Sequence, residues 1–484
     1  MSNNSYKSIF KATTLFAGVQ GINILLNLLR TKLVAIYLGP DGVGLNAIYN
    51  ETKELIHETT NCGMDQSGVR NISIAHEEMQ GTGDNKNLLD SIKLTRSLVA
   101  LLALAGTLMC IIFSYSLSLM TFSDTEHVWG YICIAPAVGM STIICGEMTI
   151  LKGSRMIKKI AGLSTVTIIV GILTNIPLYY LYGMEGVIPA ILLFNVVQML
   201  VVMRYSYKEF PPQLCFKRSF LRAGKAMLIL GGAFVLQGFM AHGARLSIQS
   251  YINNHGQLAD VGLFNSTTLI ITMYLGIFTS SLTADFFPRL SGCFSDLKER
   301  RLVICRQVDV LQIFTAPMLV AFLLGIHIIV PLLLSDKFTP IIPVLELALI
   351  TCLVRSIAIP LQYLPLAAGD SKTYLFVDFV AYAFMVTIYV SCYNLWGLIG
   401  LGYGICVFNV IDLLWAMVYA KFKYDILPNM RNMVFYVLQT ILLVGAFFVA
   451  TQLTDWAYWG VGTILFLVSA AISLYLFQIT RKES

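Results

Sequence analysis

The side chains with the clearest chemical potential lie in one helix-length segment, from Asn46 to Asp65. One face of a helix here would carry three glutamates together with an amide and an aspartate, namely Glu51, Glu54, Glu58, Asn61 and Asp65. Lys53, His57 and Thr60 would form an adjoining stripe. The whole chain is 57% hydrophobic and only 12% charged, so this concentration of charge requires an explanation.

Catalysis and metal binding receive little support from these residues. His57-Glu58 and His76-Glu77 begin like the zinc metalloprotease motif, but Asn and Gln stand where the second histidine ligand is needed. Gly224-Lys225 lacks the upstream glycine and the Ser or Thr of a phosphate-binding loop. No nucleophile, base and orienting group assemble from the sequence. We therefore predict a protein that is not an enzyme and that has no metal site or organic cofactor.

Three arginines stand within otherwise apolar stretches: Arg30, Arg245 and Arg355. A planar guanidinium can bind a phosphate through two parallel hydrogen bonds, which an ammonium matches less well. The plainer alternative is a structural ion pair, or a side chain that reaches a nearby membrane interface. We expect these arginines to bind an anionic ligand.

The apolar segments that surround these residues define the class of protein. The run 97–120 has no charge and is long enough to cross about 30 Å of hydrocarbon. Similar runs indicate an all-α polytopic membrane protein with about fourteen transmembrane helices. The proposed spans are 12–38, 43–69, 97–120, 128–151, 160–182, 186–203, 226–252, 261–287, 308–334, 340–366, 373–396, 397–420, 432–453 and 456–479.

The cost of burying charge then constrains the second span. A carboxylate at mid-membrane costs roughly 2.5–3.5 kcal/mol, so four acidic residues facing lipid would cost on the order of 10 kcal/mol. The segment must therefore line a hydrated cavity. Other embedded charges are expected to share this cavity, among them Glu147, His242, Asp285, Glu346, Asp378 and Asp412.

Lys and Arg concentrate in alternate loops, which predicts the orientation. Basic residues precede the first span and follow each even-numbered span, from the second to the twelfth. Arg481 and Lys482 follow the last span. The other loops are short and carry mainly acidic residues. By the positive-inside rule, both termini are cytoplasmic and the number of spans is even. Nothing in this distribution suggests nucleic-acid binding.

An internal repeat divides the chain. The segment 40–50 (PDGVGLNAIYN) has a partner in 258–268 (LADVGLFNSTT), and each follows a helix that contains an arginine. We predict an N-terminal six-helix lobe over 1–207, a basic cytoplasmic linker over 208–225, a C-terminal six-helix lobe over 226–424, and two additional helices with a short tail over 425–484. The linker is expected to be amphipathic and to lie on the membrane surface. Two such copies imply pseudo-two-fold symmetry about a central cleft.

The order of these motifs resembles a known family. The LGPDGVGL turn, the polar second helix, the segment LLLSDKFTP after the ninth span and the turn AAGDSKTYLFVDF look like Wzx-type flippases of O-antigen or enterobacterial common antigen. These belong to the multidrug/oligosaccharidyl-lipid/polysaccharide exporter superfamily, and the resemblance covers roughly residues 8–424. It implies a MATE-like fold of two lobes around a cavity, in the bacterial inner membrane.

The resemblance also implies a function in polysaccharide biosynthesis. The substrate would be an undecaprenyl-diphosphate-linked oligosaccharide that is moved across the bilayer by alternating access. Arg30, Lys53, Arg245 and Arg355 would hold the diphosphate. A glycan polymerase and a chain-length regulator are candidate partners. The acidic residues of the second span depart from a uniformly cationic cavity. Glu51, Glu54, His57, Glu58 and Asp65 could pair with the arginines or bind a coupling H⁺ or Na⁺.

A second interpretation remains open. The acidic second span also suits a cation-coupled antiporter of drugs or metabolites from the same superfamily, in which membrane carboxylates bind a cation. A membrane scaffold without transport activity is the third possibility. The identity of the glycan, the coupling ion and the oligomeric state are not encoded in any motif that we recognise.

Overall fold

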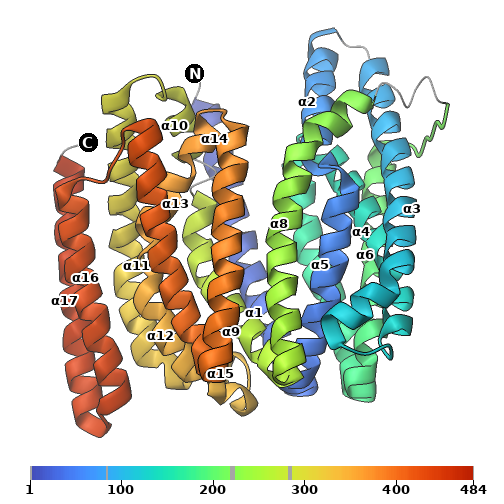
Figure 1. The fold of residues 1–484 in the computed structure, drawn as a ribbon. Helices are drawn as coiled ribbons and strands as arrows, with labels where there is room; N and C mark the ends of the chain where they lie inside the picture. Colours follow the sequence, from blue (N-terminus) through green and yellow to red (C-terminus); the bar gives the residue numbers. More distant parts are fainter. Residues whose placement is uncertain (1–2, 83–84, 218–223, 282–285, 483–484) are drawn as a thin grey trace. The chain divides into compact units, whose positions relative to one another are not determined.

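The described part of the chain consists of α-helices and short 3-10 turns. The computed structural model describes residues 3–82, 85–217, 224–281 and 286–482, without the side chains of 3–22, 81–82, 157, 226, 230, 274–281 and 482. These ranges contain no β-strand. The helices labelled in Figure 1 are α1 (Asn3–Asn61), α2 (Met64–Thr82), α3 (Lys86–Phe122), α4 (Val128–Gly153), α5 (Ile157–Tyr182), α6 (Val187–Glu209), α8 (Lys225–His255), α9 (Leu258–Ser281), α10 (Phe287–Gly292), α11 (Leu297–Leu333), α12 (Ile342–Cys352), α13 (Arg355–Gln362), α14 (Leu364–Ala367), α15 (Ser371–Tyr424), α16 (Met430–Gln452) and α17 (Asp455–Lys482).

Eight helical segments in the described ranges are long and apolar enough to cross a membrane. Two of them, 158–209 and 371–424, have 52 and 54 residues, about twice the roughly 20 residues that a crossing needs. Each is interrupted by a turn, at Gly183–Gly186 and at Gly397. The predicted multi-pass, all-helical membrane fold is therefore confirmed, whereas the number of fourteen crossings stays a prediction.

A ninth candidate span is broken. Asp336–Cys352 and Arg355–Ala367 meet at an angle of 59°. Pro360 lies inside α13 and Pro365 stands in the first turn of α14. Proline removes a backbone donor and clashes with the preceding turn, which accounts for the division between α13 and α14, whereas the bend itself lies at Leu353 and Val354, between α12 and α13.

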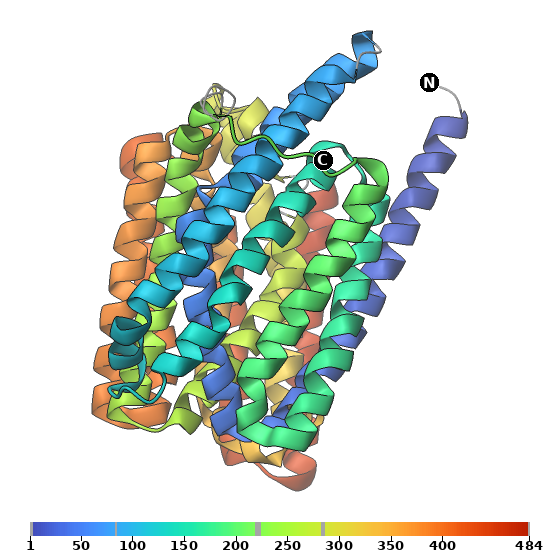
Figure 2. The same ribbon diagram turned by 90° about the vertical axis from the view of Figure 1, so that its right-hand side faces the viewer.

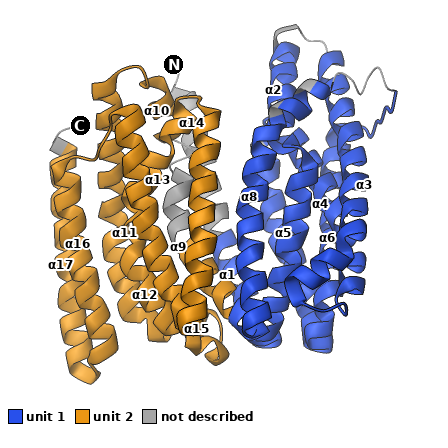
Figure 3. Cartoon of the chain, viewed as in Figure 1, with its two compact units in different colours: residues 1–262 blue, residues 263–484 orange. Residues whose placement is uncertain are grey.

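Packing divides the chain into two compact units, residues 1–262 and residues 263–484 (Figure 3). Helix α8 therefore packs with the first unit, although the sequence repeat assigns it to the second lobe. The domain boundaries 1–207, 208–225, 226–424 and 425–484 rest on the repeat and on the basic linker, and they stay a prediction.

Helix lengths recur along the chain in the way that an internal repeat requires. Helices α3 and α11 both have 37 residues, and each is followed by a Ser-Asp pair. Helix α5 and the first part of α15, residues 371–396, also have equal lengths. Both end at a glycine with positive φ, 54° at Gly183 and 60° at Gly397. These matches support the repeat independently of the short sequence motif.

Helix α1 is a pair of helices joined by a tight turn. Gly39 has φ 65° and ψ −176°, and Pro40 follows it. Figure 2 shows the chain turning back between the two halves. The first half packs on α5, where Asn23 donates a hydrogen bond to Ser164 at 2.9 Å. The second half, residues 40–61, packs on α3, α4 and α8 and carries the charged segment.

The second half of α1 contacts α8 through backbone that only glycine permits. The close approach extends to α9, where a methyl group added at Gly262 would lie 1.9 Å from the carbonyl oxygen of Pro40. At the other end, a methyl group at Gly231 would lie 1.9 Å from the carbonyl oxygen of Cys62. Small residues let helices approach closely in membranes, where van der Waals packing is a main source of helix association.

Helix α8 also caps α3. The side-chain amides of Asn253 and Asn254 donate to the carbonyl oxygens of Thr121 and Met120, both at 2.9 Å. The last carbonyls of a helix have no partner within that helix, so these bonds satisfy groups that would otherwise need water. They hold the end of α8 against the end of α3.

The second span is shorter than predicted. Cys62 and Gly63 both have positive φ, 52° and 62°, and end the α1 helix before α2 begins at Met64. The sequence-based interpretation of 43–69 as one helix is therefore wrong. Asp65 lies on α2 and does not continue the face of Glu51 and Glu58.

The described part of the linker is an extended strap on α3. Residues 211–217 contain no helix, and the backbone N–H of Cys215 donates to Ser97 Oγ on α3 at 2.8 Å. The expectation that the linker is amphipathic and lies on the membrane surface stays a prediction. Residues 218–223 of the predicted linker lie outside the described residues.

In unit 2, the AAGDSKT turn is held by its own side chains. Asp370 caps α15 by accepting from the backbone N–H and the hydroxyl of Thr373, at 3.1 and 2.8 Å. Lys423 forms an ion pair with it at 2.5 Å. The hydrogen bond from Lys423, followed by those from Thr373, lowers the pKa of Asp370 to about 2. The cap therefore stays ionised throughout the physiological range.

The core of unit 2 combines an apolar cluster with one buried polar network. Leu290, Ile304, Ile357 and Leu361 are among the fully buried side chains that join α10, α11 and α13. Where α11 meets α16, the inaccessible carboxylate of Asp309 forms an ion pair with Arg431 at 2.6 Å and accepts from Asn432 at 2.6 Å. This network anchors the first of the two C-terminal helices.

The contact between α1 and α8 can be tested with neighbouring glycines. We expect Gly231→Ala to lower the thermal unfolding midpoint, because its methyl group would overlap the Cys62 carbonyl. Gly232→Ala is the matched control, since no atom lies within 4 Å of its added methyl group. Alanine is favoured over glycine in helices by about 1 kcal/mol, so the control should be neutral or stabilising. Equal midpoints for the two variants would contradict the close contact.

Candidate functional site

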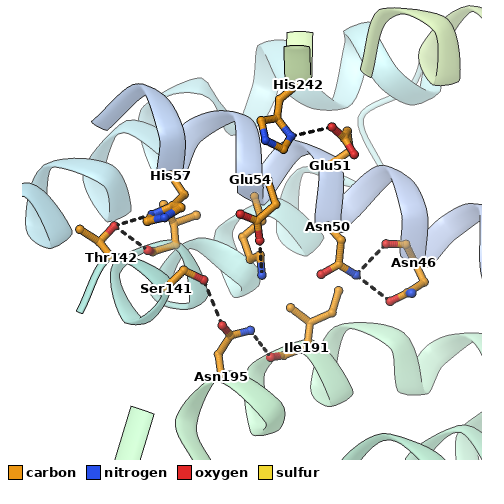
Figure 4. Close-up of polar contacts among 12 residues, drawn as sticks. Asn46, Asn50, Glu51, Glu54, His57, Ser141, Thr142, Ile191, Asn195 and His242 are labelled. Carbon is orange, nitrogen blue, oxygen red and sulfur yellow. Dashed lines mark hydrogen bonds and ion pairs between the residues drawn. The ribbon is translucent and has the colours of Figure 1, made fainter. Parts of the chain in front are cut away.

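Polar side chains from α1, α4 and α6 gather in one region of unit 1 (Figure 4). Asn50 on α1 donates from Nδ2 to the carbonyl oxygen and to Oδ1 of Asn46, both at 2.9 Å. Ser141 on α4 donates to Asn195 Oδ1 on α6 at 3.1 Å, and Asn195 Nδ2 donates to the Ile191 carbonyl at 2.7 Å. Hydroxyl and amide groups of this kind can exchange hydrogen bonds with water or with sugars.

Glu51 joins α1 to α8 through two basic side chains. Its Oε1 lies 2.7 Å from His242 Nδ1 and 3.2 Å from Arg245 Nε. Figure 4 shows the histidine ring directed at the carboxylate. The Glu51 side chain is only 15% exposed, whereas that of Arg245 is 45% exposed. The structure thus brings together two of the predicted residues, Glu51 and Arg245, and adds His242 as their common neighbour.

The stripe next to Glu51 is buried and internally paired. Lys53 Nζ lies 2.9 Å from Glu54 Oε1, with the lysine side chain 8% exposed and the glutamate 37%. His57 Nδ1 lies 3.0 Å from Thr142 Oγ1, and this hydroxyl donates its proton to the Val138 carbonyl. Because a hydroxyl has only one proton, His57 must be the donor to Thr142. Lys53 and His57 are buried, and the prediction that the segment lines a hydrated cavity stays a prediction.

Two predicted carboxylates, Glu58 and Asp65, form no ion pair among the described side chains. Glu58 is half-buried beside Gly238 of α8. Asp65, on α2, accepts a hydrogen bond from Gln66 at 3.2 Å. With Glu51 and Glu54 paired, these two acids are the predicted carboxylates of this region that keep a negative charge without an ion-pair partner among the described residues.

Arg30 contacts α5 and α6, whereas Arg245 of α8 contacts Glu51 of α1. The guanidinium of Arg30 lies against Gly171 of α5 and over the ring of Phe194 on α6, 5.4 Å from the centroid. No contact between described residues joins it to Arg245. The proposal that both arginines hold one diphosphate therefore stays a prediction.

Arg355 belongs to unit 2, so its position is described within that unit alone. It is half-buried at the start of α13. On the same helix, Gln362 donates to the buried carboxylate of Asp412 on α15, at 2.9 and 3.1 Å. A role of Arg355 in holding the diphosphate stays a prediction.

A buried ion pair that the sequence did not reveal lies in α3 and α4. Arg96 contacts Glu147 with both arms, at 2.8 and 3.0 Å, and both side chains are about 5% exposed. The guanidinium also donates to Ser206 Oγ and to the carbonyls of Phe210 and Pro211. All five N–H groups are therefore used, and the extended strap is tied to α3 and α4. The expectation that Glu147 lines the cavity is wrong, because this carboxylate is fully engaged by Arg96.

Metal binding gains no candidate from the geometry. No group of three or more His, Cys, Asp or Glu side chains within the described ranges is arranged to hold a metal ion. Asp285 lies outside the described residues. The arrangement can pair, bind or release charged ligands through Arg245, and it can bind cations or protons at Glu58 and Asp65.

A model of polysaccharide biosynthesis proteins matches residues 66–343, which is more than half of the chain. The chain belongs to this family. The resemblance inferred from the sequence motifs is thereby confirmed at the level of the family. None of the curated protein sequences searched matches the chain.

Solved structures share the fold at low sequence identity. The lipid II flippase MurJ in its inward closed conformation matches with a TM-score of 0.74 and 13% identity, over 97% of this chain and 99% of that one. An inward-facing MATE family multidrug transporter of the MOP superfamily matches with a TM-score of 0.61 and 17% identity, over 85% and 95%. A MOP superfamily transporter from Pyrococcus furiosus matches at 0.52 and 14%, over 89% and 93%. The predicted MATE-like fold is confirmed.

The buried ion pair gives a stability prediction. Glu147→Gln keeps the size of the side chain but leaves the Arg96 charge buried without a counter-ion. We expect a loss of about 3–5 kcal/mol of stability, visible as a lower thermal midpoint in detergent. Arg155→Ala is the control, because its ion pair with Glu77 is exposed on both sides and such pairs contribute about 0–1 kcal/mol. If Glu147→Gln unfolds at the same temperature as this control, the ion pair has no structural role.

Proposed function

We propose that the protein is a flippase that moves an undecaprenyl-diphosphate-linked oligosaccharide across the bacterial inner membrane by alternating access. The observation that carries the proposal is the family match, since polysaccharide biosynthesis requires lipid-linked sugars on the far side of the membrane. The likeness of the fold to a lipid II flippase over 97% of the chain agrees with it.

The site in unit 1 supports an anionic, sugar-bearing ligand. Arg245 is nearly half exposed, and its ion pair with Glu51 uses Nε, so that the terminal Nη1 has no contact among the described residues. Guanidinium groups bind phosphate oxygens through charge-assisted hydrogen bonds. Asn50 and Ser141 provide uncharged donors and acceptors for sugar hydroxyls. In this scheme Glu51 neutralises Arg245 while no substrate is bound.

A cation-coupled antiporter is the second candidate, and Glu58 and Asp65 favour it. Neither carboxylate contacts a basic side chain among the described residues, and a carboxylate inside a membrane is costly unless a cation or proton neutralises it. These two acids could also bind a coupling H⁺ or Na⁺ in a flippase. The termini are proposed to be cytoplasmic, and a polymerase and a chain-length regulator are proposed as partners.

Translocation by purified protein in liposomes tests the role of Arg245. We expect Arg245→Ala to slow the appearance of a fluorescent undecaprenyl-diphosphate oligosaccharide in the outer leaflet by roughly 10–100-fold, the cost of one hydrogen-bonded charge. Arg245→Lys should recover only part of the rate, because an ammonium cannot bind two phosphate oxygens in parallel. Arg155→Ala, which removes an exposed arginine, is the control. A normal rate in the Arg30→Ala, Arg245→Ala double variant would contradict the proposed role.

Deletion of the gene separates the two candidate functions. A flippase deletion should abolish one surface glycan and leave resistance to cationic dyes unchanged. An antiporter deletion should do the reverse. Glycan staining and dye sensitivity, measured in the same strain, decide between them.

A further inference from the structure

An apolar groove lies between α1, α3 and α8 in unit 1. Its cavity of about 230 Å³ is lined chiefly by Leu55 and Ile56 of α1, Met109, Phe113 and Leu117 of α3, and Phe239 of α8. Phe113 and Phe239 are each 49% exposed, so the groove opens on the surface of the unit. Its lining is almost wholly apolar, and the groove is therefore a place where a hydrocarbon chain can lie.

The groove adjoins the charged site. Leu55 follows Glu51 by one helical turn, and Phe239 precedes His242 by three residues, on neighbouring faces of the same helices. Arg245 is six residues beyond Phe239, a rise of about 9 Å along α8. A ligand with its anionic group at Arg245 could therefore place the adjoining hydrocarbon in the groove.

Charge complementarity decides what kind of chain fits. The exposed end of Arg245 can bind a phosphate, whereas Glu51 keeps the empty site neutral. In a polyprenyl diphosphate the hydrocarbon begins directly at the phosphate, so headgroup and chain are adjacent. In a phospholipid a glycerol backbone and two ester groups separate them. The short distance between Arg245 and Phe239 thus favours the polyprenyl compound.

The lining also suits a branched, unsaturated chain. Two phenylalanine rings face the groove, and methionine is flexible and polarisable, so that it adapts to methyl branches. The cavity is too small for a long polyprenyl chain, so only the first isoprene units can be held and the remainder must extend into the bilayer.

We propose that this groove binds the isoprene units nearest the diphosphate of the lipid-linked substrate. The proposal rests on the flippase function proposed above and adds a site that selects the lipid carrier. Binding in the groove would orient the headgroup toward the polar side chains of unit 1, while the rest of the chain stays in lipid throughout translocation.

Photo-crosslinking in liposomes tests the groove without any variant. The probe is an undecaprenyl diphosphate with a diazirine near its diphosphate end. We expect labelling of α1, α3 and α8 around Leu55, Phe113 and Phe239, and we expect unlabelled undecaprenyl diphosphate to compete. Labelling elsewhere, or equal labelling by a phosphatidylglycerol with a diazirine on its acyl chain, would overturn the proposal.

A pair of tryptophan variants gives the matched control. Phe239→Trp fills the groove and should reduce labelling by about five-fold or more, since apolar contact area is lost to the ligand. Leu236→Trp changes an exposed residue of α8 outside the groove and should leave labelling unchanged. Both positions are exposed, and size-exclusion chromatography confirms folding. Equal labelling of the two variants would contradict the groove.

The translocation and labelling results together distinguish a failure of the groove proposal from a failure of the flippase proposal. If the wild-type protein translocates the fluorescent substrate but is not labelled in the groove, the groove proposal is wrong and the flippase proposal stands. If it neither translocates the substrate nor takes up label, both are wrong.

Discussion

The cost of placing charge in hydrocarbon governs this structure. Each ionised group within a span must find a counter-charge, a hydrogen-bond partner or water. Arg96 and Glu147 meet this requirement completely, and their network ties α3, α4, α6 and the strap into one block. Glu51, His242 and Arg245 meet it only partly, because Arg245 stays nearly half exposed. The first arrangement is suited to structure, and the second is suited to exchange with a ligand.

Close backbone contact complements this electrostatic division. Gly231 on α8 and Gly262 on α9 bring these helices close to the ends of the second half of α1, and Glu51 and Arg245 lie between the two contacts. Close contacts at glycine consist of many weak interactions, so a small shift of one helix along another costs little free energy. Separating a buried ion pair costs much more, because it leaves an unpaired buried charge. By the sequence repeat α8 belongs to the second half of the chain, so this contact is where the two halves of the repeat meet within unit 1.

The lengths of the apolar segments and the positions of turn-forming residues in the sequence predicted much of the fold. The turn at Gly39, the boundary between spans at Gly397 and the two C-terminal helices follow from local chemistry. The polar face of α1 also followed from spacing and cost. The partners did not, because they lie far apart in the chain: Arg96 and Glu147 are 51 residues apart, and Glu51 and His242 are 191 apart. Composition shows that a charge needs a partner but does not say which one. The end of the helix at Cys62 was not predicted, because cysteine is not a residue type that favours positive φ.

The turns at Gly39 and Gly397 have a consequence for biogenesis. In each case two helices are joined by almost no intervening chain. Such a pair can enter the bilayer as one preassembled wedge, since its tip exposes few peptide groups that would need solvation during passage. Insertion of these segments would then require little transfer of polar chain across the membrane. A longer connecting turn would slow insertion even if the folded protein tolerated it.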